Sequence, residues 1–192
     1  MEQVYDLFPT LVMKFSGVLL PHEVDNLFKK LKEYKTNKID PALIRGRSSY
    51  GIGANDILSD LGLKKKMQEK INVYIKRLKL KPLKICNSWF SIQDVGGMLK
   101  DHSHGSSIVS GAFYVNIDEG SSPLVFENPN HLVVFNYEDV YEQSTSYTST
   151  YFNFYPQKGD LIIFPSWLKH GCNYKPNQTM DRTLISFNTQ VK

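Results

Sequence analysis

From Pro82 onward the chain is a close succession of short runs rich in β-branched and aromatic residues, separated by Gly, Pro, Asn and Asp. No helical pattern lies between these runs, which argues against a parallel α/β sheet, because parallel strands need long crossovers. We therefore predict a mainly β fold, a sandwich or jelly roll. The predicted strands are residues 84–95, 99–104, 108–117, 124–127, 132–136, 151–155, 160–164, 171–174 and 183–189.

Residues 1–82 predict helices instead. One amphipathic helix is expected to begin near Pro21, and a second, capped by Asp56 or Ser59, is expected to reach Leu78. Residues 36–55 contain glycines and arginines without a period, so we expect a long loop there, close to a site. The apolar stripes of the two helices are Val24, Leu27, Phe28, Leu31 and Tyr34, and Leu61, Met67, Ile71, Tyr74, Ile75 and Leu78.

A length of 192 residues suits one domain. We predict a single domain over residues 1–192, in which the helical part, residues 1–82, packs on one sheet of a β core formed by residues 83–192. The 136–155 tract is rich in Tyr, Ser and Thr and is expected to form a hairpin excursion or a flap.

The charge of the chain points to no particular partner. The net charge is +4, and the basic residues thin out after Lys100, so there is no strong nucleic-acid signal. No apolar run approaches the roughly 20 residues that span a bilayer, and the first residues lack the pattern of a signal peptide. We expect a cytoplasmic protein without a membrane partner, in which Cys86 and Cys172 stay reduced.

Three histidines are candidates for a metal site. Side chains two positions apart on a strand share a face, so His102 and His104 are expected to converge. His170 follows the strand predicted at 160–164, and a jelly roll can bring such distant strands together at its mouth. Arg182, 12 residues after His170, opens an apolar strand, where a guanidinium needs an anionic partner.

Four segments in this order resemble the Fe(II)- and 2-oxoglutarate-dependent oxygenases, and most of all the branch with a His-x-His ligand strand. They are DHSHGSSIVSGAFYVNI, PLVFENP, YPQKGDLIIFPSWLKHGC and DRTLISFN, and the resemblance covers residues 89–188. It implies a double-stranded β-helix that holds iron near one open end. It also implies hydroxylation of a substrate, with release of succinate and CO2.

The resemblance also implies roles for individual residues. His102, His104 and His170 would bind the metal, and Arg182 would pair with the distal carboxylate of 2-oxoglutarate. Tyr114 and Ser186 are further candidate contacts of the cosubstrate, although a tyrosine can equally well fill the barrel interior. The substrate, a small molecule or a peptide, is not indicated.

The chain departs from the usual ligand pattern at His104, where most members of the superfamily carry Asp or Glu. Either three imidazoles hold the iron, or a nearby acid such as Asp101 replaces one of them. Strand alternation places Asp101 on the opposite face from His102, so we favour three histidines. Such a site lacks one negative charge, and we expect it to retain Fe(II) more weakly.

Two other functions stay open from the sequence. Three histidines with one open position also suit a zinc hydrolase or lyase, and incidental histidines suit a non-enzymatic jelly-roll binding module. A cupin dioxygenase is disfavoured, because residues 108–112 read Ile-Val-Ser-Gly-Ala where its glutamate would stand. Trp89 and Trp167 are expected in the core or a pocket wall, and a homodimer is left open.

Overall fold

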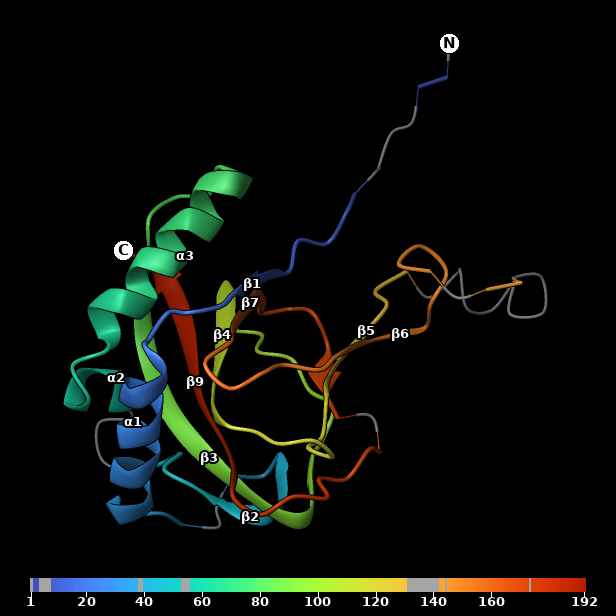
Figure 1. The fold of residues 1–192 in the computed structure, drawn as a ribbon. Helices are drawn as coiled ribbons and strands as arrows, with labels where there is room; N and C mark the ends of the chain where they lie inside the picture. The colour runs from blue at the N-terminus through green and yellow to red at the C-terminus, as the bar shows by residue number, and fades with distance from the viewer. Residues whose placement is uncertain are drawn as a thin grey trace.

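The fold is organised around two antiparallel sheets, seen in a computed structural model that describes residues 2–3, 8–37, 40–52, 56–130, 142–143, 145–172 and 174–192 (Figure 1). One sheet has six strands in the order β1-β7-β4-β9-β3-β2, and the other has three in the order β6-β5-β8. The strands are β1 (Met13–Phe15), β2 (Leu43–Ser48), β3 (Leu83–Leu99), β4 (Val109–Asn116), β5 (Leu124–Glu127), β6 (Tyr151–Phe154), β7 (Leu161–Pro165), β8 (His170–Gly171) and β9 (Arg182–Val191). This is the predicted jelly roll.

Three helices lie on the outer face of the six-stranded sheet (Figure 1): α1 (Pro21–Glu33), α2 (Ile57–Asp60) and α3 (Lys64–Leu78). Helix α1 begins at Pro21 as predicted and buries Val24, Leu27 and Leu31. The backbone N–H of Leu20 donates to the Glu23 carboxylate over 2.7 Å, which satisfies one of the free amides at the helix start. The apolar face that was predicted for this helix thus packs into the hydrophobic core.

The single helix predicted after Asp56 is wrong, because the structure divides it into α2 and α3. Asp56 caps α2 as expected, with its carboxylate accepting from the Ser59 backbone N–H. The break falls at Gly62, whose φ of +69° is left-handed and ends the first helix. A periodic apolar pattern continues across such a turn, so it does not reveal the interruption.

The loop predicted over residues 36–55 is also wrong in part, since β2 lies within it and pairs with β3. The register shifts between Ile44 and Gly46, and the intervening Arg45 has a positive φ of 49°. This irregularity removes the alternation by which a strand is recognised in a sequence.

Four later strands, β4, β5, β6 and β7, match their predicted positions within a residue at each end. The strand predicted at 132–136 lies outside the described residues.

Alternate residues of the six-stranded sheet serve two separate cores. On β4, Phe113 and Val115 face the helices, whereas Ala112 and Tyr114 face the smaller sheet. The second core, between the sheets, contains Phe126, Phe164 and other apolar side chains. Tyr114 therefore points into the space between the two sheets.

We expect Gly111→Ala to lower the free energy of unfolding by about 1–3 kcal/mol, the cost of overpacking a core. Gly111 on β4 is paired with Phe187 on β9, and a Cβ at Gly111 would lie only 2.2 Å from the Phe187 ring. Urea denaturation measures the change. Gly105→Ala is the matched control, because its Cβ would meet nothing within 4 Å. Phe187→Leu should recover part of the loss in the Gly111→Ala background, and an additive effect would contradict this explanation.

Candidate functional site

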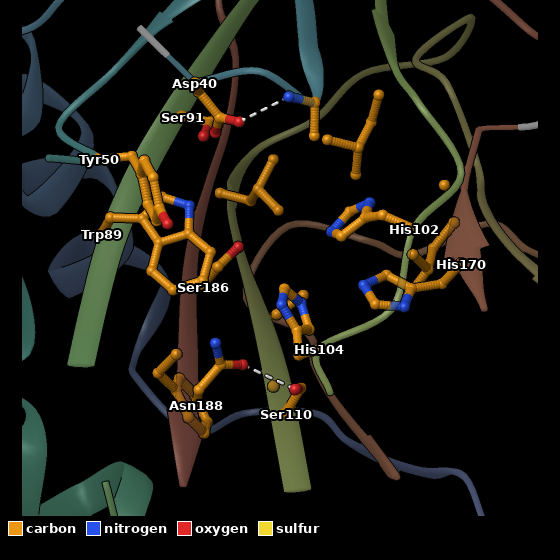
Figure 2. Close-up of a pocket in the computed structure, with 18 of the residues that line it drawn as sticks. Asp40, Tyr50, Trp89, Ser91, His102, His104, Ser110, His170, Ser186 and Asn188 are labelled. Carbon is orange, nitrogen blue, oxygen red and sulfur yellow. Dashed lines mark hydrogen bonds between the residues drawn. The ribbon is translucent and has the colours of Figure 1, made fainter. Parts of the chain in front are cut away.

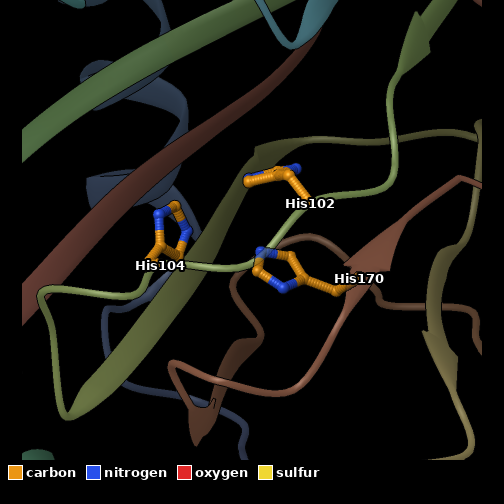
Figure 3. Close-up of side chains that lie close together, drawn as sticks. All are labelled: His102, His104 and His170. Carbon is orange, nitrogen blue, oxygen red and sulfur yellow. The ribbon is translucent and has the colours of Figure 1, made fainter.

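The three histidines singled out in the sequence lie close together (Figure 3). His102 and His170 form an isolated antiparallel bridge, with two backbone hydrogen bonds of 2.9 Å between them. The backbone N–H of His104 donates to the Ser166 carbonyl over 2.9 Å. One ring nitrogen from each histidine lies within 4.8 Å of those of the other two. The three imidazoles are therefore close enough to bind one metal ion.

The strand predicted at residues 99–104 is wrong, because β3 ends at Leu99 and the histidine pair follows in a loop. The pair still converges, because the loop runs beside the segment from Ser166 to His170 and hydrogen-bonds to it at alternate residues, His102 and His104. The expected geometry thus comes from tertiary pairing rather than from a regular strand.

Hydrogen bonds orient two of the imidazole rings. Nδ1 of His102 lies 2.8 Å from the Lys100 carbonyl, and Nδ1 of His170 lies 2.8 Å from the Leu168 carbonyl. A carbonyl oxygen only accepts, so each Nδ1 carries the proton and each Nε2 keeps a free lone pair. This is the arrangement that fixes histidine ligands in metal sites.

Burial also keeps His104 and His170 uncharged. Together with repulsion from His102, burial lowers the pKa of His170 to about 3 and that of His104 to about 4. Both rings are thus neutral near pH 7 and can donate electron pairs to a metal. Among the described residues, the cluster consists of three imidazoles and includes no carboxylate.

Asp101, the acid considered as a substitute ligand, lies outside the cluster. Its carboxylate packs over Gly171, where an added Cβ would lie 2.1 Å from the Asp101 Oδ1. Glu127 and, to a smaller extent, Asp101 raise the pKa of Lys169, so the Asp101 charge acts on that lysine. Among the described residues, the group of potential metal ligands consists of the three histidines. The structure therefore favours the all-histidine set.

A cavity of about 450 Å³ is lined by the three histidines, which Figure 2 shows, and also by Arg182. Tyr114 and Ser186 line it too, as expected, and Leu184 occupies the position two residues after the arginine. The loop residues Asp40 and Tyr50 also line it, which confirms that this loop lies near the site. Within the described part of the 136–155 tract, residues 142–143 and 145–155, no side chain lines this cavity.

Arg182 is 4% exposed and has no carboxylate partner among the described residues. Its Nε donates to the Ser122 carbonyl over 3.0 Å, its Nη1 donates to Oε1 of Gln93 over 2.6 Å, and its guanidinium lies 5.4 Å from the centre of the Tyr114 ring. Burial lowers the pKa of Arg182, which reflects the cost of a cation without a counter-ion. An anion in the cavity would remove that cost.

Two buried hydroxyls beside the arginine also lack partners among the described residues. They are the Tyr114 hydroxyl and the Ser122 Oγ. Buried polar atoms are rarely left without a hydrogen bond, so two of them beside an unpaired guanidinium indicate a site for a polar anion. Burial raises the pKa of Tyr114 to about 12, so its hydroxyl stays protonated and can donate.

Gln93 and Ser122 were missed in the sequence. Gln93 is paired with Arg182 across the β3–β9 ladder, and both side chains are buried. A polar residue at an inward position of a strand is the only local signal for Gln93, and Ser122 lies in a connecting segment without any signal.

Trp89 lines the cavity as expected, whereas the expectation for Trp167 is wrong, since it is 56% exposed. Both cysteines are free, as expected.

The sequence family described as "Putative 2OG-Fe(II) oxygenase" matches residues 87–188, just over half of the chain, including all three histidines and Arg182. The chain belongs to this family of 2OG-Fe(II) oxygenases. Its cofactor is therefore Fe(II) and its cosubstrate 2-oxoglutarate, and neither a zinc hydrolase nor a binding module is favoured. No curated protein sequence matches the chain.

Solved structures share the fold at low sequence identity. HygX from Streptomyces hygroscopicus, solved with nickel, 2-oxoglutarate and hygromycin B, superposes with a TM-score of 0.65 at 15% identity over 95% of this chain and 84% of HygX. A Pseudomonas putida prolyl-4-hydroxylase gives 0.65 at 13% identity over 97% and 96% of the two chains. The viral collagen prolyl hydroxylase of Paramecium Bursaria Chlorella virus-1, a 2OG complex, gives 0.58 at 12% identity over 94% and 96%.

No described helix has the length and apolar character needed to cross a membrane.

Proposed function

We propose that this oxygenase hydroxylates a small-molecule substrate and releases succinate and CO2. In this proposal His102, His104 and His170 hold Fe(II), and Arg182, Tyr114 and Ser186 bind 2-oxoglutarate. The observation that carries it is one cavity lined both by three imidazoles and by a buried guanidinium that has no carboxylate partner among the described residues. When bound, Fe(II) supplies the activation of O2 that is coupled to oxidative decarboxylation of 2-oxoglutarate.

The residues of the chain orient the two ligands. Carbonyl-bonded Nδ1 atoms turn Nε2 of His102 and His170 toward the metal. The Arg182 guanidinium is held on two sides by Gln93 and the Ser122 carbonyl, which leaves its remaining N–H groups for the distal carboxylate of 2-oxoglutarate. The unpaired Tyr114 hydroxyl supplies a further donor.

Succinate formation tests this function. The purified protein, with Fe(II), ascorbate and 2-oxoglutarate under air, is expected to form succinate slowly without substrate and faster with one. Anaerobic samples and samples without Fe(II) are the controls. Absence of succinate, together with absence of 2-oxoglutarate binding, would overturn the proposal.

We expect Tyr114→Phe to raise the dissociation constant of 2-oxoglutarate by about 10-fold or more, since one hydrogen bond to a charged group is lost. The free energy of unfolding should not fall, because the hydroxyl that is removed has no partner among the described residues. Calorimetric titration of the metal-loaded protein measures the first effect, and urea denaturation measures the second.

Tyr74→Phe is the matched control for that variant. The buried Tyr74 hydroxyl donates to the Leu11 carbonyl over 2.8 Å, so its loss should lower stability and leave 2-oxoglutarate affinity unchanged. A Tyr114→Phe protein that is less stable and binds 2-oxoglutarate normally would show that Tyr114 only fills the barrel interior.

A further inference from the structure

The cavity wall opposite the histidine cluster carries an acid, Asp40, that has no ion-pair partner among the described residues. Of the described residues that line the cavity, Asp40 and Arg182 carry a full charge at neutral pH. Asp40 lies in the segment that crosses from the edge of β2 toward the histidine loop, where the Lys100 N–H donates to the Ala42 carbonyl over 2.8 Å. Oδ1 of Asp40 accepts from the Ala42 N–H over 3.0 Å, and no described cation forms an ion pair with this carboxylate.

An aromatic pair lies on the same wall (Figure 2). The Tyr50 and Trp89 rings are 5.3 Å apart and nearly perpendicular, and Trp89 lies 6.2 Å from the His104 ring. Trp89 is thus the ring that links His104 to Tyr50, which is 37% exposed. Aromatic faces beside a carboxylate are the usual surroundings of a bound organic cation.

Asn188 offers donors at the other end of this wall. Its Oδ1 accepts from the Ser110 hydroxyl over 2.7 Å, and Ser110 is 2.8 Å from the Ser166 hydroxyl. Ser110 thus fixes the amide so that Nδ2 is turned away from it, toward the cavity (Figure 2). The two N–H groups of this nitrogen make no hydrogen bond to a described residue and suit an acceptor oxygen.

From these three features we infer that the substrate is a small organic cation, an amine or quaternary ammonium compound that also carries a hydroxyl or carbonyl oxygen. Its cationic group lies between the Asp40 carboxylate and the Tyr50 and Trp89 rings, and its oxygen accepts from Asn188. This inference rests on the proposed function, whose substrate class it names. Repulsion from Asp40 disfavours a substrate whose charged group is a carboxylate, and the proposed function assigns Arg182 to the cosubstrate.

Choline and its uncharged isostere 3,3-dimethylbutan-1-ol form a matched pair of probes that differ in the charged atom. The protein carries Trp167→Phe, which leaves Trp89 in the cavity as the single tryptophan, and is loaded with Mn(II) and 2-oxoglutarate. Titration of Trp89 fluorescence should show choline binding about 10-fold more tightly than the isostere. Asp40→Asn should remove most of that difference without weakening the isostere.

Asp60→Asn, an exposed acid on α2, is the control and should leave both titrations unchanged. Equal responses to the two probes, including no response to either, would overturn the cation inference, as would an Asp40→Asn protein that still prefers choline. A choline preference that depends on Asp40 in a protein that forms no succinate would overturn the proposed hydroxylation and uphold the cation site. A lysine-containing peptide that binds more tightly than any free amine would overturn the small-molecule assignment.

Discussion

Replacing Arg182 by Met is expected to raise the dissociation constant of 2-oxoglutarate by about 30- to 5000-fold. Truncating one member of a buried, hydrogen-bonded charge pair costs about 2–5 kcal/mol, and each 1.4 kcal/mol is about tenfold in affinity. Arg182 is 4% exposed and has no described acidic partner, so the cosubstrate carboxylate would be its counter-ion. Calorimetric titration of the Mn(II)-loaded protein under anaerobic conditions measures the change.

The unliganded Arg182→Met protein is expected to remain folded. Gln93 and the Ser122 carbonyl each lose a hydrogen bond, but an unpaired buried charge disappears as well. Arg182→Lys should also bind weakly, because an ammonium cannot make the bidentate contact. Arg77→Met, on the exposed surface of α3, is the control. A folded Arg182→Met protein that binds 2-oxoglutarate within about threefold of the wild-type value would refute the assignment.

Removal of a histidine from the cluster is expected to have the second large effect. His170→Ala should weaken Fe(II) or Mn(II) binding by more than about 100-fold. Substituting a residue that only hydrogen-bonds to a metal ligand already lowers metal affinity by about 10- to 100-fold, and loss of a ligand itself should cost more. His170 is 5% exposed, is held through Nδ1 by the Leu168 carbonyl, and lies within reach of the other two rings. Electron paramagnetic resonance of free Mn(II) in an anaerobic titration gives the affinity directly.

His22→Ala, an exposed position on α1, is the matched control and should bind metal normally. His104→Asp adds the carboxylate that most of the superfamily carries, so it should bind Fe(II) more tightly than the wild-type protein. This variant is informative because the described cluster contains imidazoles and no carboxylate, so it lacks the Coulomb attraction that an acidic ligand adds for a divalent cation. Normal metal binding by His170→Ala would show that the cluster is not the metal site.

The positions of most strands and of α1 could be predicted because they depend on local patterns. The apolar spacing in α1 shows which face of the helix must be buried. The short runs of β-branched and aromatic residues in β4 to β7 likewise mark buried strands. The break between α2 and α3 and the bulged strand β2 escaped prediction, because a left-handed residue at Gly62 and a register shift near Gly46 leave no periodic trace.

Within the site, residue identity and order were enough to nominate His102, His104, His170 and Arg182, since few residue types bind metals or diacids and these four stand in a family order. The backbone pairing that brings the three histidines together could not be predicted from residue identity and order. His102 exchanges backbone hydrogen bonds with His170 in β8, whereas the His104 N–H donates to the Ser166 carbonyl before β8. Both histidines are thus held by a loop and not by the strand that alternation predicted. Such pairing joins residues 68 positions apart, and no local signal records it.

By itself the sequence determined the chemical components of this protein: its β-rich second half, the histidines His102, His104 and His170, and Arg182 at the start of an apolar strand. Only the tertiary structure decided that Asp101 packs on Gly171 outside the cluster, that Gln93 holds Arg182, and that Asp40 faces the histidines across one cavity. The physical reason is that composition and periodicity act on neighbours along the chain, whereas a binding site is made where the folded backbone brings distant side chains together and removes water from them.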